Sequence, residues 1–121
     1  MPEHVHLLLW PTSPLFQVSA YLSTIKQSVS KRARLHLRRR DPIRLEKGFH
    51  FWQDGPGYDR NLIDERSIWH EIDYIHANPV RRGLCERPED WRWSSAAQFC
   101  GLSTLDLLMD LSSLPPDLRT R

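Results

Sequence analysis

Two histidines near the start of the printed sequence have the spacing of a cation site. His4 and His6 are separated by one residue within an apolar stretch, 3–10 (EHVHLLLW). Side chains of an extended segment alternate between two faces, so both imidazoles are expected on one face. Adjacent imidazoles form a platform for a divalent cation, which predicts His4 and His6 as metal ligands. The alternative is a pair with a structural role, because this spacing alone has low specificity.

A second pair of polar side chains, Tyr74 and Asn78, is spaced by four residues in the string YIHAN. In a helix, residues four apart lie on one face. On a helical wheel started at Ile68, the two lie at about 240° and 280°, beside the apolar stripe that contains Ile72 and Ile75. The phenol can then reach a pocket on the sheet, and the amide oxygen can join a metal as a third ligand. The alternative is a boundary tyrosine followed by an ordinary asparagine at a helix end.

Positive charge is concentrated in one segment. Between Lys26 and Lys47 there are nine Lys or Arg residues and two acids, whereas the rest of the chain has eight basic and thirteen acidic residues. A local charge of +7 within a net charge of +2 predicts a surface that binds a polyanion. The alternative is a solvated helix face. The expected DNA-binding residues are Lys26, Lys31, Arg34, Arg38, Arg39 and Arg40.

The elements that must position these residues can be read from apolar periodicity and from capping residues. Two short apolar stretches are predicted as strands, 3–10 and 49–53 (FHFWQ). Three helices are expected. They run from a cap at 12–14 to about Arg40, from a cap at Asp64 until Pro79 stops the helix after Asn78, and over 94–99.

The length of 121 residues suits one small domain with a core. No apolar run approaches a membrane span, and the first residues lack the basic region of a signal peptide, so the expected location is cytoplasmic. Cys85 and Cys100 match no zinc spacing and are expected to be free thiols, with a disulfide left open. Four tryptophans are expected in the core, with stacking on nucleic-acid bases as the alternative for one of them. They are Trp52, Trp69, Trp91 and Trp93.

Longer strings of the sequence resemble a known family. The string MPEHVHLLL (1–9) resembles the histidine–hydrophobe–histidine motif of the HUH single-strand DNA transposases. The stretch 51–96 resembles the REP-associated tyrosine transposases, and its most specific parts are YIHANPVRRGL and PEDWRWSSA. The matches together cover most of residues 1–99, and their combination is far more specific than any one part.

The resemblance implies a mobile-element enzyme that binds single-stranded or hairpin DNA, and it implies a role for each polar pair. His4, His6 and Asn78 would ligate Mg²⁺ or Mn²⁺. Tyr74 would attack a phosphodiester, leaving a 5′-phosphotyrosine and a free 3′-hydroxyl, and reversal of this step would rejoin strands. The implied fold class is α+β, a ferredoxin-like antiparallel sheet with packed helices.

The sequence departs from this family at its start. Family members carry a strand, a helix and a further strand before the HVH strand, whereas here only three residues precede His4. The expected fold is therefore an incomplete ferredoxin-like sheet, with a transposase-like catalytic domain over 1–99, truncated at its N-terminus, and a C-terminal tail over 100–121. The hypothesis is a truncated gene or a reading frame started too late.

A truncated chain would expose sheet edges and apolar surface, which would favour aggregation or a homodimer, or leave it inactive. Two alternatives to an active enzyme therefore stay open. One is a DNA-binding relic of a transposase that cuts nothing. The other is a small metal-binding or structural domain unrelated to DNA.

Overall fold

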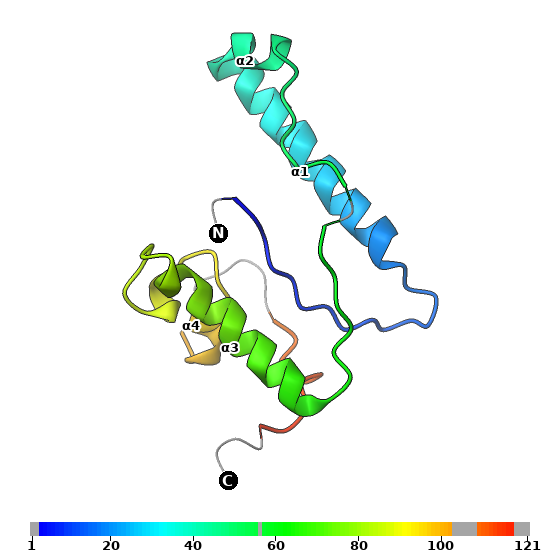
Figure 1. Cartoon of the computed structure of the whole chain (residues 1–121), viewed down its shortest axis with the longest axis vertical. Helices are drawn as coiled ribbons and strands as arrows, with labels where there is room; N and C mark the ends of the chain where they lie inside the picture. The colour runs from blue at the N-terminus through cyan, green and yellow to red at the C-terminus, as the bar shows by residue number, and fades with distance from the viewer. Residues whose placement is uncertain (1–2, 56, 103–108, 118–121) are drawn as a thin grey trace. The chain divides into compact units, whose positions relative to one another are not determined.

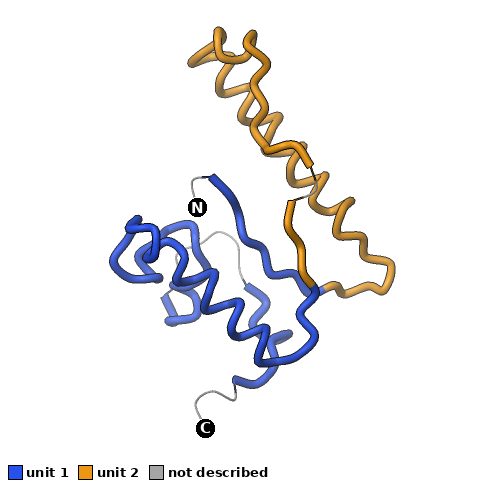
Figure 2. Tube along the Cα trace, in the orientation of Figure 1, with its two compact units in different colours: residues 1–10, 61–121 blue, residues 11–60 orange. Residues whose placement is uncertain are grey.

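The computed structural model describes residues 3–55, 57–102 and 109–117. Its regular elements are all helices (Figure 1). They are α1 (Val18–Arg40), α2 (Pro42–Glu46), α3 (Glu65–Arg81), the 3₁₀ turn η1 (Pro88–Asp90) and α4 (Ala96–Phe99). The chain forms two compact units (Figure 2): unit 1 contains 1–10 and 61–121, and unit 2 contains 11–60.

The expected antiparallel sheet is wrong: no strand occurs among the residues that the structure describes. A strand is defined by the hydrogen bonds of a neighbouring strand and not by apolar composition. The segments 3–10 and 49–53 were the two expected strands, and they belong to different units. Neither has a strand partner within the described ranges, so an α+β ferredoxin-like fold is not supported.

The segment 4–10 is nevertheless extended in the way that its sequence predicts. His4 and His6 are half-buried, whereas Val5 and Leu7 between and after them are 59% and 48% exposed. This alternation places both imidazoles on the inner face of the segment. The sheet prediction fails, but the local geometry on which the histidine site depends is present.

Helix α3 begins where its capping residue predicts. The Asp64 carboxylate accepts a hydrogen bond from the Ser67 backbone N–H at 2.8 Å, which satisfies one of the unpaired donors of the first turn. Ile72, in the expected apolar stripe, is 5% exposed. The cap fixes the start of the helix, and the buried stripe fixes its rotation, so the flank beside the stripe carries Tyr74 and Asn78.

The end of α3 differs from the prediction, because Pro79 lies inside the helix and is buried. Pro79 lacks a backbone N–H donor, but the helical hydrogen-bond pattern continues beyond it, because the Arg82 N–H donates to the Asn78 carbonyl at 3.1 Å. The helix ends at Arg81, and two residues later Gly83 has a φ of +66° that suits glycine. Gly83 donates to the Val80 carbonyl and Leu84 donates to the Pro79 carbonyl, both at 2.9 Å.

The core of unit 1 is small and lies between α3 and α4. Ile72, Ala96 and Ala97 are its buried apolar residues among those described. Phe99 of α4 packs edge-on against Trp69 and His76 of α3, with ring centroids 6.3 Å and 4.9 Å away. The short helix predicted over 94–99 is present as α4. Cys85 and Cys100 are both free thiols, as expected.

In unit 2, α1 begins later than the predicted cap at 12–14, with Gln17 as its N-cap residue, and ends at Arg40 as expected. The Trp52 indole donates to the Lys26 carbonyl at 2.9 Å, and the Lys26 ammonium donates to the Gly55 carbonyl at 3.2 Å. These bonds hold the segment after α2 along α1. No residue of α1 is buried.

Two further expectations concern the membrane and the tail. None of the described helices combines the length and the apolar composition needed to cross a bilayer. Residues 103–108 and 118–121 of the expected tail lie outside the described residues, and the division at residue 99 stays a prediction.

Candidate active site

The two histidines of the opening segment converge on one point. Their Nε2 atoms lie 3.1 Å apart, and their rings meet edge to face at 90° with centroids 4.8 Å apart. The Glu3 carboxylate forms an ion pair with Arg82, the residue that follows α3. This ion pair holds the start of the segment beside the C-terminal end of the helix.

Asn78 of α3 completes the cluster. Its Nδ2 atom lies 3.0 Å from His6 Nε2, although the two residues are 72 positions apart in the sequence. His6 Nε2 therefore faces two polar groups, the His4 ring nitrogen and the Asn78 amide. The structure brings together the three predicted metal ligands, and their role as ligands stays a prediction.

Tyr74 lies beside the same cluster. Its ring centroid is 5.8 Å from that of His6, with the planes at 86°, and the residue is 39% exposed. The Arg81 guanidinium lies 5.5 Å from the centroid of the Tyr74 ring. Asn78 follows Tyr74 by four residues, and Arg81 follows Asn78 by three. All three side chains therefore share one face of α3. Sequence analysis missed Arg81, although its spacing of seven from Tyr74 is two helical turns.

The charge state of His6 suits metal binding. Burial lowers the pKa of His6, the neighbouring His4 lowers it further, and the Glu71 carboxylate opposes both effects. A lowered pKa favours the neutral imidazole, which is the form that ligates a metal ion. Glu71 is one turn before Tyr74 on α3, and the sequence analysis did not single it out.

Two separations within this cluster match those between the ligands of a small divalent cation. Bonds of about 2.1 Å at right angles require ligand atoms about 3.0 Å apart. The separations from His6 Nε2 are 3.1 Å to His4 Nε2 and 3.0 Å to the Asn78 amide. An amide can present either its nitrogen or its oxygen, because rotation by 180° exchanges two groups of nearly equal size. Within the described ranges no group of three His, Cys, Asp or Glu side chains could hold a metal, so this set relies on an amide.

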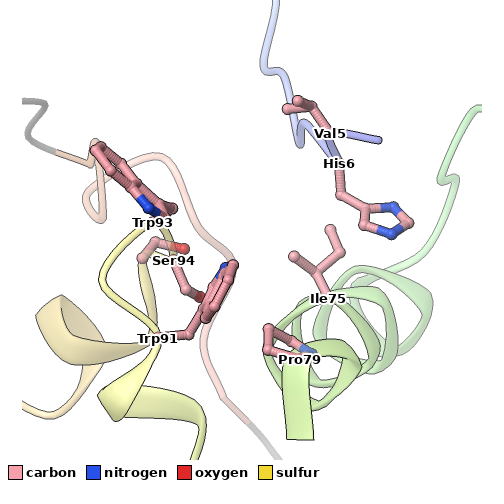
Figure 3. A pocket seen from close by; sticks show the side chains of 8 residues that line it. Val5, His6, Ile75, Pro79, Trp91, Trp93 and Ser94 are labelled. Carbon is pink, nitrogen blue, oxygen red and sulfur yellow. The ribbon is translucent and has the colours of Figure 1, made fainter. Parts of the chain in front are cut away.

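A pocket of about 520 Å³ adjoins the histidine cluster and shares His6 with it (Figure 3). Val5, His6, Ile75 and Pro79 lie on one side, and Trp91, Trp93 and Ser94 lie on the other. Both sides belong to unit 1.

The expectation that its tryptophans are core residues is wrong for Trp93, which is 71% exposed, while Trp91 is half-buried. Residues 91–94 form a turn, in which the Ser94 backbone N–H donates to the Trp91 carbonyl at 2.9 Å, and exposure of Trp93 in this turn was not predicted from the sequence.

The predicted DNA-binding residues all lie on α1 in unit 2. Helix α1 has seven Lys or Arg residues and no acid, because Arg32 adds to the six that were predicted. Lys26 is engaged with Gly55, whereas Lys31, Arg34 and the run 38–40 are exposed. The three arginines of the last turn also complement the helix dipole. DNA binding by this face stays a prediction.

Comparison with known proteins gives one relative. The chain is similar to a protein of Haemophilus influenzae described as "Putative REP-associated tyrosine transposase", with 31% identity over 99 residues. The match covers 78% of this chain and 54% of that protein, so the chain spans about half the length of the relative. No family model matches the chain, and no solved structure matches it. The similarity agrees with the family that the sequence motifs resemble.

Proposed function

We propose that this chain is a metal-dependent tyrosine DNA transposase that binds single-stranded or hairpin DNA and cleaves and rejoins it through Tyr74. The observation that carries the proposal is the meeting of four side chains from two segments of unit 1. His6 lies within hydrogen-bond distance of both His4 and Asn78, and the Tyr74 ring lies edge-on to the His6 ring. A nucleophile beside a cation-binding set is what phosphodiester cleavage requires.

Tyr74 supplies the nucleophile of the proposed reaction. Its phenol oxygen attacks the phosphorus atom while its proton passes to solvent, and the bond from phosphorus to the 3′-oxygen breaks. The 3′-oxygen leaves as a hydroxyl after taking up a proton, and the 5′-phosphate stays on the tyrosine. One phosphate ester replaces another, so attack by a different 3′-hydroxyl can rejoin the strand without ATP.

His4, His6 and Asn78 would hold Mg²⁺ or Mn²⁺. Once bound, that cation would polarise the scissile phosphate and stabilise the negative charge that develops in the transition state. The lowered pKa of His6 favours its neutral ring, which is the form that ligates a metal ion. Arg81 places a second positive charge beside Tyr74, where it can contact a phosphate oxygen.

Helix α1 supplies the binding surface in this proposal. Seven cations without an acid give a sequence-independent attraction for the phosphate backbone, and this attraction weakens as salt rises. Such a face needs charge and exposure but no buried geometry, which agrees with the absence of buried residues in α1.

The proposal is tested with a 3′-labelled hairpin oligonucleotide that carries single-stranded flanks, incubated with the full chain and Mg²⁺. We expect a labelled protein–DNA adduct that survives a denaturing gel and is lost with EDTA and in Tyr74→Phe. The matched control is Tyr58→Phe, because Tyr58 is 89% exposed and lies in unit 2.

Two results would contradict the proposal. Salt-sensitive binding without an adduct would make the chain a DNA-binding protein that does not cleave. Absence of binding at low salt would leave a domain unrelated to DNA.

A further inference from the structure

The pocket beside His6 adjoins the proposed cleavage site. Its volume of about 520 Å³ lies in the range of ligand pockets. One wall is formed by Ile75 and Pro79 of α3 and the facing wall by Trp91 and Trp93, so a flat group can enter between them (Figure 3). The function proposed above uses His6 but assigns nothing to the rest of the pocket.

The tryptophan wall has the chemistry of a stacking platform. Trp93 is 71% exposed, which is unusual for the largest apolar side chain, and the Arg92 guanidinium lies 5.0 Å from its ring centroid. An indole and an adjacent guanidinium can bind a base and its phosphate respectively. Among the described residues of unit 1, the buried core is formed by residues other than Trp93.

A hydroxyl in the wall can contact the edge of a bound group. Ser95 lines the pocket, and its Oγ lies 2.9 Å from His76 Nε2. This contact fixes the hydroxyl while leaving it a further hydrogen-bonding position. The neighbouring Ser94 is buried, and its Oγ accepts from the Ala96 backbone N–H at 3.2 Å. Ser95 is therefore the more available polar group of this wall.

We propose that this pocket holds one unpaired DNA base next to the phosphate that Tyr74 attacks, stacked on the wall formed by Trp91 and Trp93. The inference rests on the proposed function, because the pocket and the cleavage site share His6. A base is the flat group that a single strand necessarily brings to the site, and the cations of Arg81 and Arg92 suit the phosphates on either side of it. A base held there would fix which phosphate reaches Tyr74.

The first test measures binding of a fluorescent single-stranded oligonucleotide by anisotropy, with EDTA present so that no cleavage occurs. We expect Trp93→Ala to weaken binding by roughly 5- to 150-fold, the range for loss of one base–aromatic stack. Trp93→Phe should restore part of the affinity, because a phenyl ring also stacks. The matched control is Trp10→Ala, since Trp10 is a 67% exposed tryptophan of unit 1 that does not line the pocket.

Abasic substitutions along the oligonucleotide locate the base. One position should weaken wild-type binding by as much as Trp93→Ala does, and combining the two changes should add nothing further. Equal effects of Trp93→Ala and Trp10→Ala, or full additivity at every abasic position, would overturn the inference.

A photocrosslink provides a readout that does not depend on substituting the pocket. An oligonucleotide with 5-iodouracil at that position should crosslink to a peptide containing residues 91–95. A crosslink confined to peptides that lack these residues would overturn the inference.

The adduct assay separates failure of this inference from failure of the proposed function. If a Tyr74 adduct forms and Trp93→Ala has no effect on binding, the proposed cleavage activity stands and the proposed base pocket is wrong. If binding depends on Trp93 but no adduct forms, the proposed base pocket is supported and the proposed cleavage reaction is wrong.

Discussion

The two units of this molecule concentrate polar residues in opposite ways. Unit 1 brings two imidazoles, an amide and a phenol together through contacts of 3.0–3.1 Å and one ring contact. Unit 2 has seven cationic side chains along α1, and no residue of α1 is buried. The first arrangement depends on the register between an extended segment and a helix. The second depends only on charge and on the integrity of one helix.

This difference predicts that mutations can change cleavage and binding separately. Catalysis requires reacting groups to be placed within fractions of an ångström, whereas attraction for a phosphate backbone tolerates movement of each cation. Substitutions in unit 1 should change the rate of adduct formation, and substitutions on α1 should change the affinity and its dependence on salt.

The largest effect is expected from removing a ligand of the proposed cation. His6→Ala should slow adduct formation by about 10²- to 10⁴-fold, because several kcal/mol of transition-state stabilisation are lost at 1.36 kcal/mol per tenfold. Single-turnover kinetics at saturating DNA measures the rate. His70→Ala is the control, since His70 is an exposed histidine of the same helix. A rate within a factor of two of wild type in His6→Ala would remove the metal site from the account.

The second prediction concerns the cations of α1. Changing Arg38, Arg39 and Arg40 to Gln should reduce the slope of log Kd against log salt by about 2, at roughly 0.7 per lost contact with single-stranded DNA. Binding titrations at several salt concentrations measure the slope. The same three changes to Lys should retain it, and neither triple variant should alter the adduct rate at saturating DNA. An unchanged slope in the Gln variant would place the DNA elsewhere.

A smaller effect is expected from the end of α3, which positions Asn78. Gly83→Ala should lower the free energy of unfolding of unit 1 by about 1–2 kcal/mol, because alanine at a φ of +66° is strained. Urea denaturation followed by circular dichroism measures this loss. Gly83→Asn should lose less, since asparagine tolerates the left-handed region. Equal stability of the alanine variant would mean that Gly83 does not hold a left-handed backbone conformation after α3.

The smallest effect concerns pH and the start of α3. The hydrogen bond from the Ser67 backbone N–H lowers the pKa of Asp64 from its ordinary value of 3.8. The stabilisation from the ionised carboxylate is therefore present above that value and is lost as the pH falls through the lowered pKa. Asp64→Asn keeps a capping side chain that does not titrate.

Thermal unfolding of both proteins from pH 7 to pH 2 tests this expectation. The two melting temperatures should run parallel down to about pH 4, where carboxylates begin to titrate, and the wild type should then fall faster. Parallel curves over the whole range would show that Asp64 does not cap α3.

Short-range patterns predicted most of what the candidate site needs. The alternation of an extended segment gave His4 and His6 a common face, and the helical period did the same for Tyr74 and Asn78. The structure bears out both local geometries. The Asp64 cap was equally readable, because a cap depends on the first turn alone.

What the sequence could not predict depends on distant partners. An apolar stretch becomes a strand only beside another strand, and the described part of the chain offers none to 3–10. Exposure of Trp93 depends on how few residues pack around it, which a hydrophobicity pattern does not reveal. Pro79 gave a wrong prediction of the helix end, because the effect of a proline on a helix depends on its position. Gly83, four residues later, is the better signal of where α3 ends.

The most direct test of the account is to identify the residue that carries DNA. The chain has three tyrosines, Tyr21, Tyr58 and Tyr74. Adduct formed with Mg²⁺ is digested with nuclease and protease, and mass spectrometry of the peptides locates the attached 5′-nucleotide. The account predicts that the nucleotide is found on Tyr74 in the wild type and on no residue in His6→Ala. A nucleotide on Tyr21 or Tyr58, or an adduct that still forms in Tyr74→Phe, would contradict it.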